Sequence, residues 1–132
     1  MNEDQLARYK RKHPHLFAPE ESVATPVPTG PSATERELQA DIVAEFGNLG
    51  WICWELFKGS TRGGAIWCTT GIPDLYVFRP GRAFWLELKQ PGNGPTPEQL
   101  ARHAELRRAG LPIFVAWTVE EALLIAQEME TR

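Results

Sequence analysis

The stretch GIPDLYVFRPGRAFWLELK, residues 71–89, decides the fold, because it reads as two apolar strands joined by a tight turn at 79–82. Three charged side chains interrupt its apolar pattern: Asp74, Glu87 and Lys89. Charged groups are rarely buried in strands unless they are paired or bind a metal. These three residues therefore require a chemical explanation.

The length of the turn determines which residues face each other. A loop of two or four residues centred on Pro80 and Gly81 pairs positions whose numbers sum to 161, which sets Asp74 opposite Glu87. Because side chains alternate along a strand, Lys89 shares the face of Glu87. A three-residue loop would shift the sum to 162 and separate Asp74 from Glu87. The even-numbered loop predicts that all three charges converge at one end of the hairpin.

Two carboxylates directly opposite each other repel, and in a dry site the pKa of one would rise strongly. Either Lys89 neutralises part of this charge or a divalent cation lies between the oxygens, and the residues leave both explanations open. Such hard oxygen ligands suit Mg²⁺ or Mn²⁺, and Mg²⁺ is typically held by one or two carboxylates with water and substrate phosphate. The main-chain carbonyl of Leu88 is a further candidate ligand.

A helix is predicted from residue 32 to the glycines at 47 and 50, with an apolar stripe of Leu38, Ile42, Phe46 and Leu49. Glu35 precedes Leu38 by three positions and so projects near this stripe, toward whatever the helix packs on. Glu35 also fits a capping box with Ser32. A metal ligand and a helix cap are both open for Glu35.

The rest of the chain predicts an α/β domain with a mixed central sheet of about four strands, flanked by helices in the order α-β-β-β-α-β and followed by a C-terminal helix. The helix at 96–110 has Thr96 as N-cap and Gln99 as its capping-box partner, and a second capping box runs from Thr118 to Glu121. Because a helix separates the hairpin from the last strand, that strand should run parallel to its neighbour. The other predicted segments are a strand at 51–57, a glycine-rich loop at 58–64, a strand extension at 65–70 and a strand at 111–117.

Composition indicates one domain behind a tail. The chain has 132 residues, of which 42% are hydrophobic, enough for a core of ordinary size. Residues 1–31 combine a basic cluster with a Pro-rich run and are expected to form a flexible arm that is disordered or contacts a polyanion or a partner; the folded domain is expected at 32–132. No run approaches about 18 apolar residues and the N-terminal residues show no apolar signal segment, so neither a membrane span nor a secretory signal is expected.

The net charge of -3 excludes nucleic-acid binding by bulk positive charge, so phosphate binding must come from a local patch or from bound cations. The two cysteines, Cys53 and Cys68, lack CxxC spacing and read as buried free thiols in a reducing cytosol. The histidines at 13, 15 and 103 show no zinc-ligand spacing relative to either cysteine.

The residues IPD and LELK, at 72–74 and 86–89, resemble the PD-(D/E)xK signature of the restriction-endonuclease-like nucleases. Their context is similar to the VRR-NUC branch of that superfamily: a helix opening with TERELQ, a GIPDL strand, an ELK strand, and a TPEQ helix that ends in RRAG before a strand. The ERELQ start also resembles archaeal-type Holliday-junction resolvases. The resemblance spans residues 34–117 and implies a restriction-endonuclease-like core.

The resemblance implies that Asp74 and Glu87 are metal ligands and that Lys89 is the catalytic lysine. Glu35 matches the acid of the first helix, with Glu37 as the alternative if the alignment shifts by two positions. Gln99 matches a glutamine often found on the following helix, although its capping role is an equally good account. A metal at the two carboxylates would lower the pKa of bound water and stabilise charge on the phosphate.

The expected function is a Mg²⁺- or Mn²⁺-dependent DNA endonuclease, selective for branched DNA and acting as a homodimer in a bacterial host cytoplasm, as for a phage product. Expected DNA contacts are Lys58, Ser60 and Arg62 in the glycine-rich loop and Arg102 on the later helix, with Trp67, Arg107 and Arg108 as weaker candidates. The alternative is a catalytically inactive nucleic-acid-binding or protein-interaction module on the same fold, in which the three charges form an ion-paired cluster.

Overall fold

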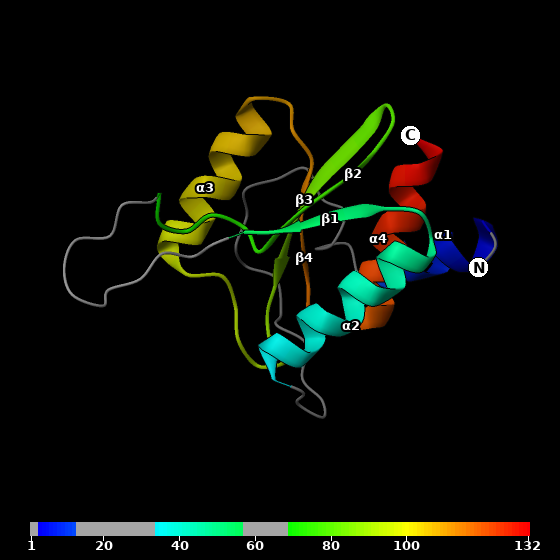
Figure 1. Ribbon diagram of the computed structural model, residues 1–132, viewed down its shortest axis with the longest axis horizontal. Helices are drawn as coiled ribbons and strands as arrows, with labels where there is room; N and C mark the ends of the chain where they lie inside the picture. Colours follow the sequence, from blue (N-terminus) through cyan, green and yellow to red (C-terminus); the bar gives the residue numbers. More distant parts are fainter. Residues whose placement is uncertain (1–2, 13–33, 57–68) are drawn as a thin grey trace.

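The computed structural model describes residues 3–12, 34–56 and 69–132. It has the predicted α/β architecture, a four-stranded mixed sheet with helices packed against it (Figure 1). In chain order the elements are α1 (Glu3–Lys12), α2 (Glu35–Asn48), β1 (Ile52–Glu55), β2 (Leu75–Arg79), β3 (Arg82–Leu88), α3 (Pro97–Arg108), β4 (Ile113–Ala116) and α4 (Val119–Thr131).

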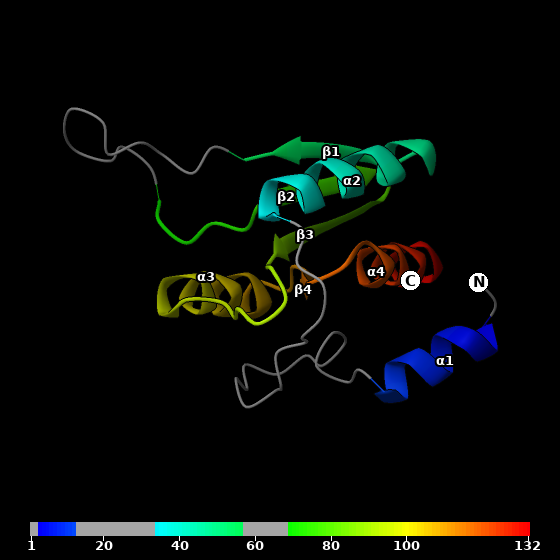
Figure 2. The same cartoon turned by 90° about the horizontal axis from the view of Figure 1, so that it is seen from below.

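The strands follow one another in the order β1-β2-β3-β4, as Figure 2 shows from top to bottom. Strands β1 and β2 are antiparallel, as are β2 and β3, whereas β3 and β4 are parallel. The helix α3 connects the two parallel strands, because a chain must cross over before it can run in the same direction again. This confirms the parallel last strand that the sequence predicted.

The hairpin of β2 and β3 has the register expected for a two-residue loop. Leu75 pairs with Leu86 and Arg79 pairs with Arg82, so paired positions sum to 161. The loop consists of Pro80 and Gly81, and the φ angle of Gly81 is 77°, a left-handed conformation that glycine adopts without a steric penalty. The prediction of an even-numbered loop is therefore confirmed.

One face of the sheet forms the hydrophobic core. Inward-pointing residues of β2 and β3 are fully buried and pack with α2 and α4, and these are Leu75, Val77, Phe84, Leu86 and Leu88. Figure 1 shows α2 and α4 apart from α3, which contacts the sheet from the opposite face through the side chain of Glu87. The sheet thus has one face covered by two helices and one face shared between α3 and exposed residues.

Two details of α2 differ from the sequence prediction. The N-cap is Thr34, whose hydroxyl accepts a hydrogen bond from the Glu37 main-chain N–H at 3.1 Å, so the helix is capped two positions later than predicted and Glu35 is its first residue. Of the predicted apolar stripe, the first three residues are buried, but Leu49 is the C-cap and is 50% exposed. Since the helix ends at Asn48, Leu49 no longer follows the helical period that would turn it inward.

Part of the expected tail is helical. Helix α1 has Glu3 and Asp4 in its first turn and Arg8 and Arg11 further along, an arrangement that complements the helix dipole. Residues 13–33 and 57–68 lie outside the described residues, and with them Cys68, most of the expected 65–70 strand and the 58–64 loop. Thr69 and Thr70, the described end of that segment, are not in a strand.

Cys53 is a free thiol on β1. It is half-buried and not fully buried as predicted. Burial, together with the nearby negative charge of Glu55, raises the pKa of the Cys53 thiol to about 11. In the described part of the chain, no helix is long and apolar enough to cross a bilayer.

Candidate active site

The side chain of Asp74 closes the open end of the hairpin. The β2–β3 ladder begins at Leu75, and the Oδ2 atom of Asp74, one residue earlier, accepts a hydrogen bond from the Leu88 main-chain N–H at 2.7 Å. Asp74 is only 5% exposed. Its side chain therefore takes the place of a strand residue as the partner of Leu88.

The same contact orients the carbonyl group of Leu88. Lys89, the next residue, donates its main-chain N–H to Ala116 of the β4 end at 3.1 Å. The main-chain N–H and carbonyl groups of successive strand residues point alternately to the two neighbouring strands. Since the Lys89 N–H points toward β4, the Leu88 N–H and carbonyl point away from β4 and toward Asp74. A carboxylate and a main-chain carbonyl thus lie on the same side of β3.

Glu87 is fully buried and is held by two side chains of α3. Its Oε1 atom lies 3.2 Å from His103 Nε2, and its Oε2 atom accepts a hydrogen bond from Gln99 Nε2 at 3.3 Å. When Glu87 is ionised, as a metal ligand must be, its carboxylate can only accept, and the Nε2 atom of His103 then carries the hydrogen in this contact. These donors offset the large cost of burying a charge away from water.

Gln99 has the predicted capping role and also contacts Glu87, while its part in catalysis stays a prediction. Its Oε1 atom accepts from the Thr96 main-chain N–H at 2.9 Å, and the Thr96 hydroxyl accepts from the Gln99 main-chain N–H at 3.2 Å. The capping box fixes which end of the amide is the oxygen, since a main-chain N–H needs an acceptor. The amide nitrogen is thereby directed at Glu87.

A glycine brings the hairpin into close contact with α3. Gly71 has a φ angle of 81°, and a Cβ atom added there would lie 2.6 Å from the carbonyl oxygen of Glu98 and 3.0 Å from the main-chain nitrogen of Gln99. Only a residue without a side chain allows this approach. Gly71 therefore sets the distance between the segment that carries Asp74, just before β2, and the helix that carries Gln99.

Lys89 follows β3 and is 8% exposed. Strand alternation places it on the face of Glu87. Within the described residues, its side chain makes no hydrogen bond or ion pair with another side chain. The residue as a whole is buried, and its role at the site stays a prediction.

Glu35 is half-buried at the first position of α2, and Glu37 is exposed. Among the described residues, no three His, Cys, Asp or Glu side chains are grouped as metal ligands. The structure thus brings Asp74 close to Glu87 through Leu88, but it does not gather Glu35 with them into one three-carboxylate group.

Of the predicted DNA contacts, the structure describes only the arginines of α3. Lys58, Ser60, Arg62 and Trp67 lie outside the described residues. Arg102 lies on α3, where its Nε atom forms an ion pair with Glu105 at 2.8 Å. Arg107 and Arg108 are in the last turn of α3, a favourable position for positive charge near a helix C-terminus.

Sequence reasoning missed His103, which is 1% exposed and contacts Glu87. A signal was present, because His103 follows Gln99 by four positions and residues at this spacing share one face of a helix. If Gln99 is placed on the side of the helix that faces the sheet, the same spacing predicts that His103 also faces the sheet.

Comparisons with known proteins support a nuclease family. No protein-family model matches the chain. "Putative nuclease p44" of Acyrthosiphon pisum secondary endosymbiont phage 1 is 32% identical over 82 residues, which cover 61% of this chain and 80% of that protein. A solved structure described as "VRR_NUC domain" is 28% identical, with a TM-score of 0.57 over 72% of this chain and 97% of that one. The chain belongs to the VRR-NUC nuclease family.

Proposed function

We propose that this chain is a nuclease that hydrolyses phosphodiester bonds of DNA with Mg²⁺ or Mn²⁺ and that it prefers branched DNA such as four-way junctions. The phage relative named a nuclease and the similar VRR_NUC domain support nuclease activity. The observation that carries the proposal is the hydrogen bond from Leu88 to Asp74. This hydrogen bond connects the IPD part of the motif, at 72–74, with the LELK part, at 86–89, at the open end of the hairpin.

A divalent cation fits the chemistry of this donor set. The residues that would hold it are Asp74, Glu87 and the carbonyl group of Leu88, which supply the oxygen ligands that Mg²⁺ and Mn²⁺ prefer. When bound, such an ion lowers the pKa of water and neutralises charge on phosphate oxygens. Glu35 stays a proposed additional ligand, which would have to join the others by a side-chain rearrangement.

The side chains of the protein then divide the remaining work. His103 and Gln99 hold both oxygens of Glu87 in place, so the carboxylate keeps one orientation when DNA approaches. Lys89, on the same face, is proposed to orient the attacking water or to stabilise the negative charge that develops on the phosphate.

The test is a cleavage assay on supercoiled plasmid and on labelled four-way-junction DNA with Mg²⁺, with Mn²⁺ and with EDTA. Wild-type protein should cut with either metal, cut the junction faster than linear duplex, and be inactive in EDTA. Asp74→Asn and Glu87→Gln should each lower the rate by roughly a thousandfold or more. Glu98→Gln removes an exposed carboxylate of α3 and serves as the matched control, with a rate near that of wild type.

A non-catalytic binding module is the second candidate, because both oxygens of Glu87 are engaged by α3, as they would be in a purely structural cluster. If no DNA is cut with either metal, and Asp74→Ala alters stability without altering a metal titration, this candidate replaces the nuclease. Cleavage that survives Asp74→Ala would mean that the active site lies elsewhere.

We further propose a homodimer, which would place two active sites on two DNA strands, and a bacterial host cytoplasm as the place of action, since the relative is phage-encoded. Light scattering at several concentrations tests the dimer. A mass equal to one chain at all concentrations, together with full junction cleavage, would contradict it.

A further inference from the structure

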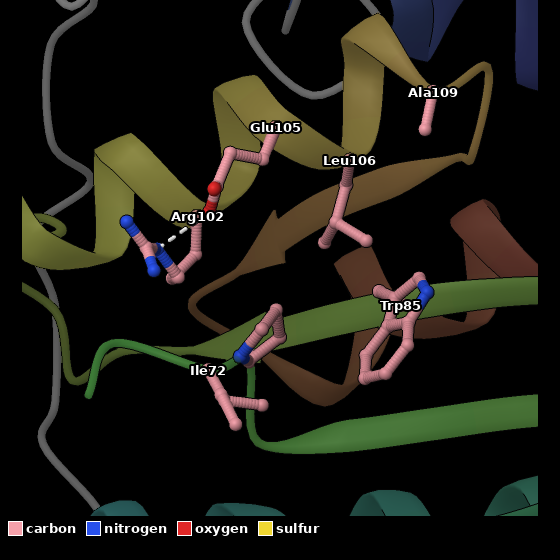
Figure 3. A pocket seen from close by; sticks show the side chains of 7 residues that line it. Ile72, Trp85, Arg102, Glu105, Leu106 and Ala109 are labelled. Carbon is pink, nitrogen blue, oxygen red and sulfur yellow. Dashed lines mark ion pairs between the residues drawn. The ribbon is translucent and has the colours of Figure 1, made fainter. Parts of the chain in front are cut away.

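A pocket of about 290 Å³ lies between the base of the hairpin and α3. Figure 3 shows Ile72 and Trp85 on the strand side and Arg102, Leu106 and Ala109 on the helix side. Its volume is at the lower limit of small-molecule pockets. It therefore has room for a small, flat ligand and not for an extended one.

The pocket lies directly beside the candidate active site. Pro73 lines it and precedes Asp74, whereas Trp85 lines it and shares a strand face with Glu87, two residues later. On the helix, Arg102 is the neighbour of His103. Asp74 and Glu87 do not line the pocket themselves, but they follow the lining residues Pro73 and Trp85 by one and two positions.

The lining suits the chemistry of a nucleobase. Trp85 provides an aromatic surface, and Ile72, Pro73 and Leu106 provide aliphatic contacts. The ion pair of Arg102 and Glu105, at 2.8 Å, adds a hydrogen-bond donor and an acceptor to this otherwise apolar lining. A base has two apolar π-faces and a polar edge, so its faces and its edge both find partners here.

A strip of aromatic rings continues from Trp85 across the face of the sheet opposite the core. Ring centroids are 4.7 Å apart for Trp85 and Tyr76, 5.4 Å for Tyr76 and Phe78, and 5.1 Å for Phe78 and Trp54. Trp54 is 58% exposed. Tyr76, Phe78 and Trp85 are half-buried, and aromatic rings at a sheet surface are sites on which successive unpaired bases stack.

We propose that the pocket binds one unpaired base next to the cleaved phosphate and that the aromatic strip stacks the bases that follow. This inference rests on the proposed function, because it assigns the substrate of the same site. Extracting a base from a duplex costs free energy, and the cost is smallest where the base is already unpaired. The pocket thereby favours branch points and single-stranded ends over intact duplex.

The experiment measures binding and not cleavage, in EDTA at low ionic strength. Fluorescence anisotropy compares a labelled oligothymidine of about 15 nucleotides with an oligonucleotide of the same length built from abasic sites. Wild-type protein should bind the base-bearing strand roughly tenfold more tightly, from the usual strength of base–aromatic stacking. Trp85→Ala should reduce this ratio to about twofold or less.

A pocket-filling variant provides the second arm. Ala109 lines the pocket and is exposed at the end of α3, so Ala109→Phe should occupy the space of the base and abolish the preference without removing a core side chain. Ala101→Phe places the same ring at an exposed position of the same helix that does not line the pocket, and it should keep the wild-type ratio. Circular dichroism melts establish that each variant is folded.

Equal affinity of wild-type protein for both oligonucleotides would overturn the proposal. It would also be overturned if Trp85→Ala left the ratio unchanged but converted a dimer to a monomer in light scattering, because the face would then belong to a second copy of the chain. Asp74→Asn separates the two proposals, since it should abolish cleavage and keep the base preference. A protein that shows the preference but never cuts would refute the nuclease and retain the base pocket.

Discussion

At the scale of single residues, the site depends on one buried carboxylate. Glu87 is fully buried, and an unpaired charge in such a place would cost several kcal/mol or more. The structure supplies His103 and Gln99 as partners for its two oxygens. His103 is therefore a positioning residue, which we expect to act on the reaction only through the orientation of Glu87.

The variants His103→Leu and His103→Gln test this role. The leucine removes the donor to Glu87, and kcat for junction cleavage should fall roughly 10- to 100-fold with little change in KM for DNA, as for other residues that support a metal ligand. Glutamine keeps an N–H donor of similar reach and should restore a substantial part of kcat. Equal losses in both variants, or an increase in KM alone, would contradict the positioning role.

At the scale of elements, α3 joins the parts of the site. Its first turn is fixed by the capping box of Thr96 and Gln99, and the same turn is the surface against which Gly71 packs. The helix thus starts at a defined point on the hairpin, which sets where Gln99 and His103 meet Glu87.

Gly71→Ala should separate these two elements. The added Cβ would lie 2.6 Å from the carbonyl oxygen of Glu98, so α3 or the hairpin must move. Gly92 has a comparable φ angle of 94° but nothing within 4 Å, and Gly92→Ala should cost only the backbone strain of about 1–2 kcal/mol. Gly71→Ala should cost about 1–3 kcal/mol more, as overpacked sites do, and should also lower cleavage. Urea unfolding measures the free energy of unfolding of the Gly71→Ala and Gly92→Ala variants. Equal losses in the two variants would show that the close contact of Gly71 with α3 does not affect stability.

At the scale of the whole molecule, the two faces of the sheet have different tasks. Helices α2 and α4 bury one face as the core, while the other face carries the candidate site, the pocket and the aromatic strip. With a net charge of -3, the protein has no general attraction to DNA, so recognition must come from local features of this second face.

The proposed domain boundary predicts that a chain of residues 32–132 folds and cuts DNA like the full chain. Its thermal midpoint should lie within about 2 °C of the full-length value, because the removed segment should contribute less than about 0.5 kcal/mol. A chain of residues 40–132 is the contrasting deletion, since it loses the Thr34 cap and the buried Leu38 and should unfold at a clearly lower temperature. A large loss of stability already in the first deletion would mean that the tail belongs to the domain.

The sequence by itself determined the order of the described elements from α2 onward, the register of the hairpin and the capping box of Thr96 and Gln99. These features depend on neighbours in the chain: a two-residue turn fixes pairing, alternation fixes the face of each strand residue, and a cap requires a partner three positions away. The same local rules predict the convergence of Asp74 and Glu87, and the structure shows the hydrogen bond from the Leu88 main-chain N–H to Asp74.

Only the tertiary structure decided how separate elements meet. It revealed the contact of His103 with Glu87, the second contact of Gln99 with Glu87, the approach of Gly71 to α3 and the pocket between the hairpin and α3. It also showed that Glu35 does not form a three-carboxylate group with Asp74 and Glu87 in the described residues. Such contacts depend on the packing distance between a helix and a sheet, and a difference of one ångström decides whether two side chains touch. No local pattern encodes that distance, because it results from all the side chains that fill the space between the elements.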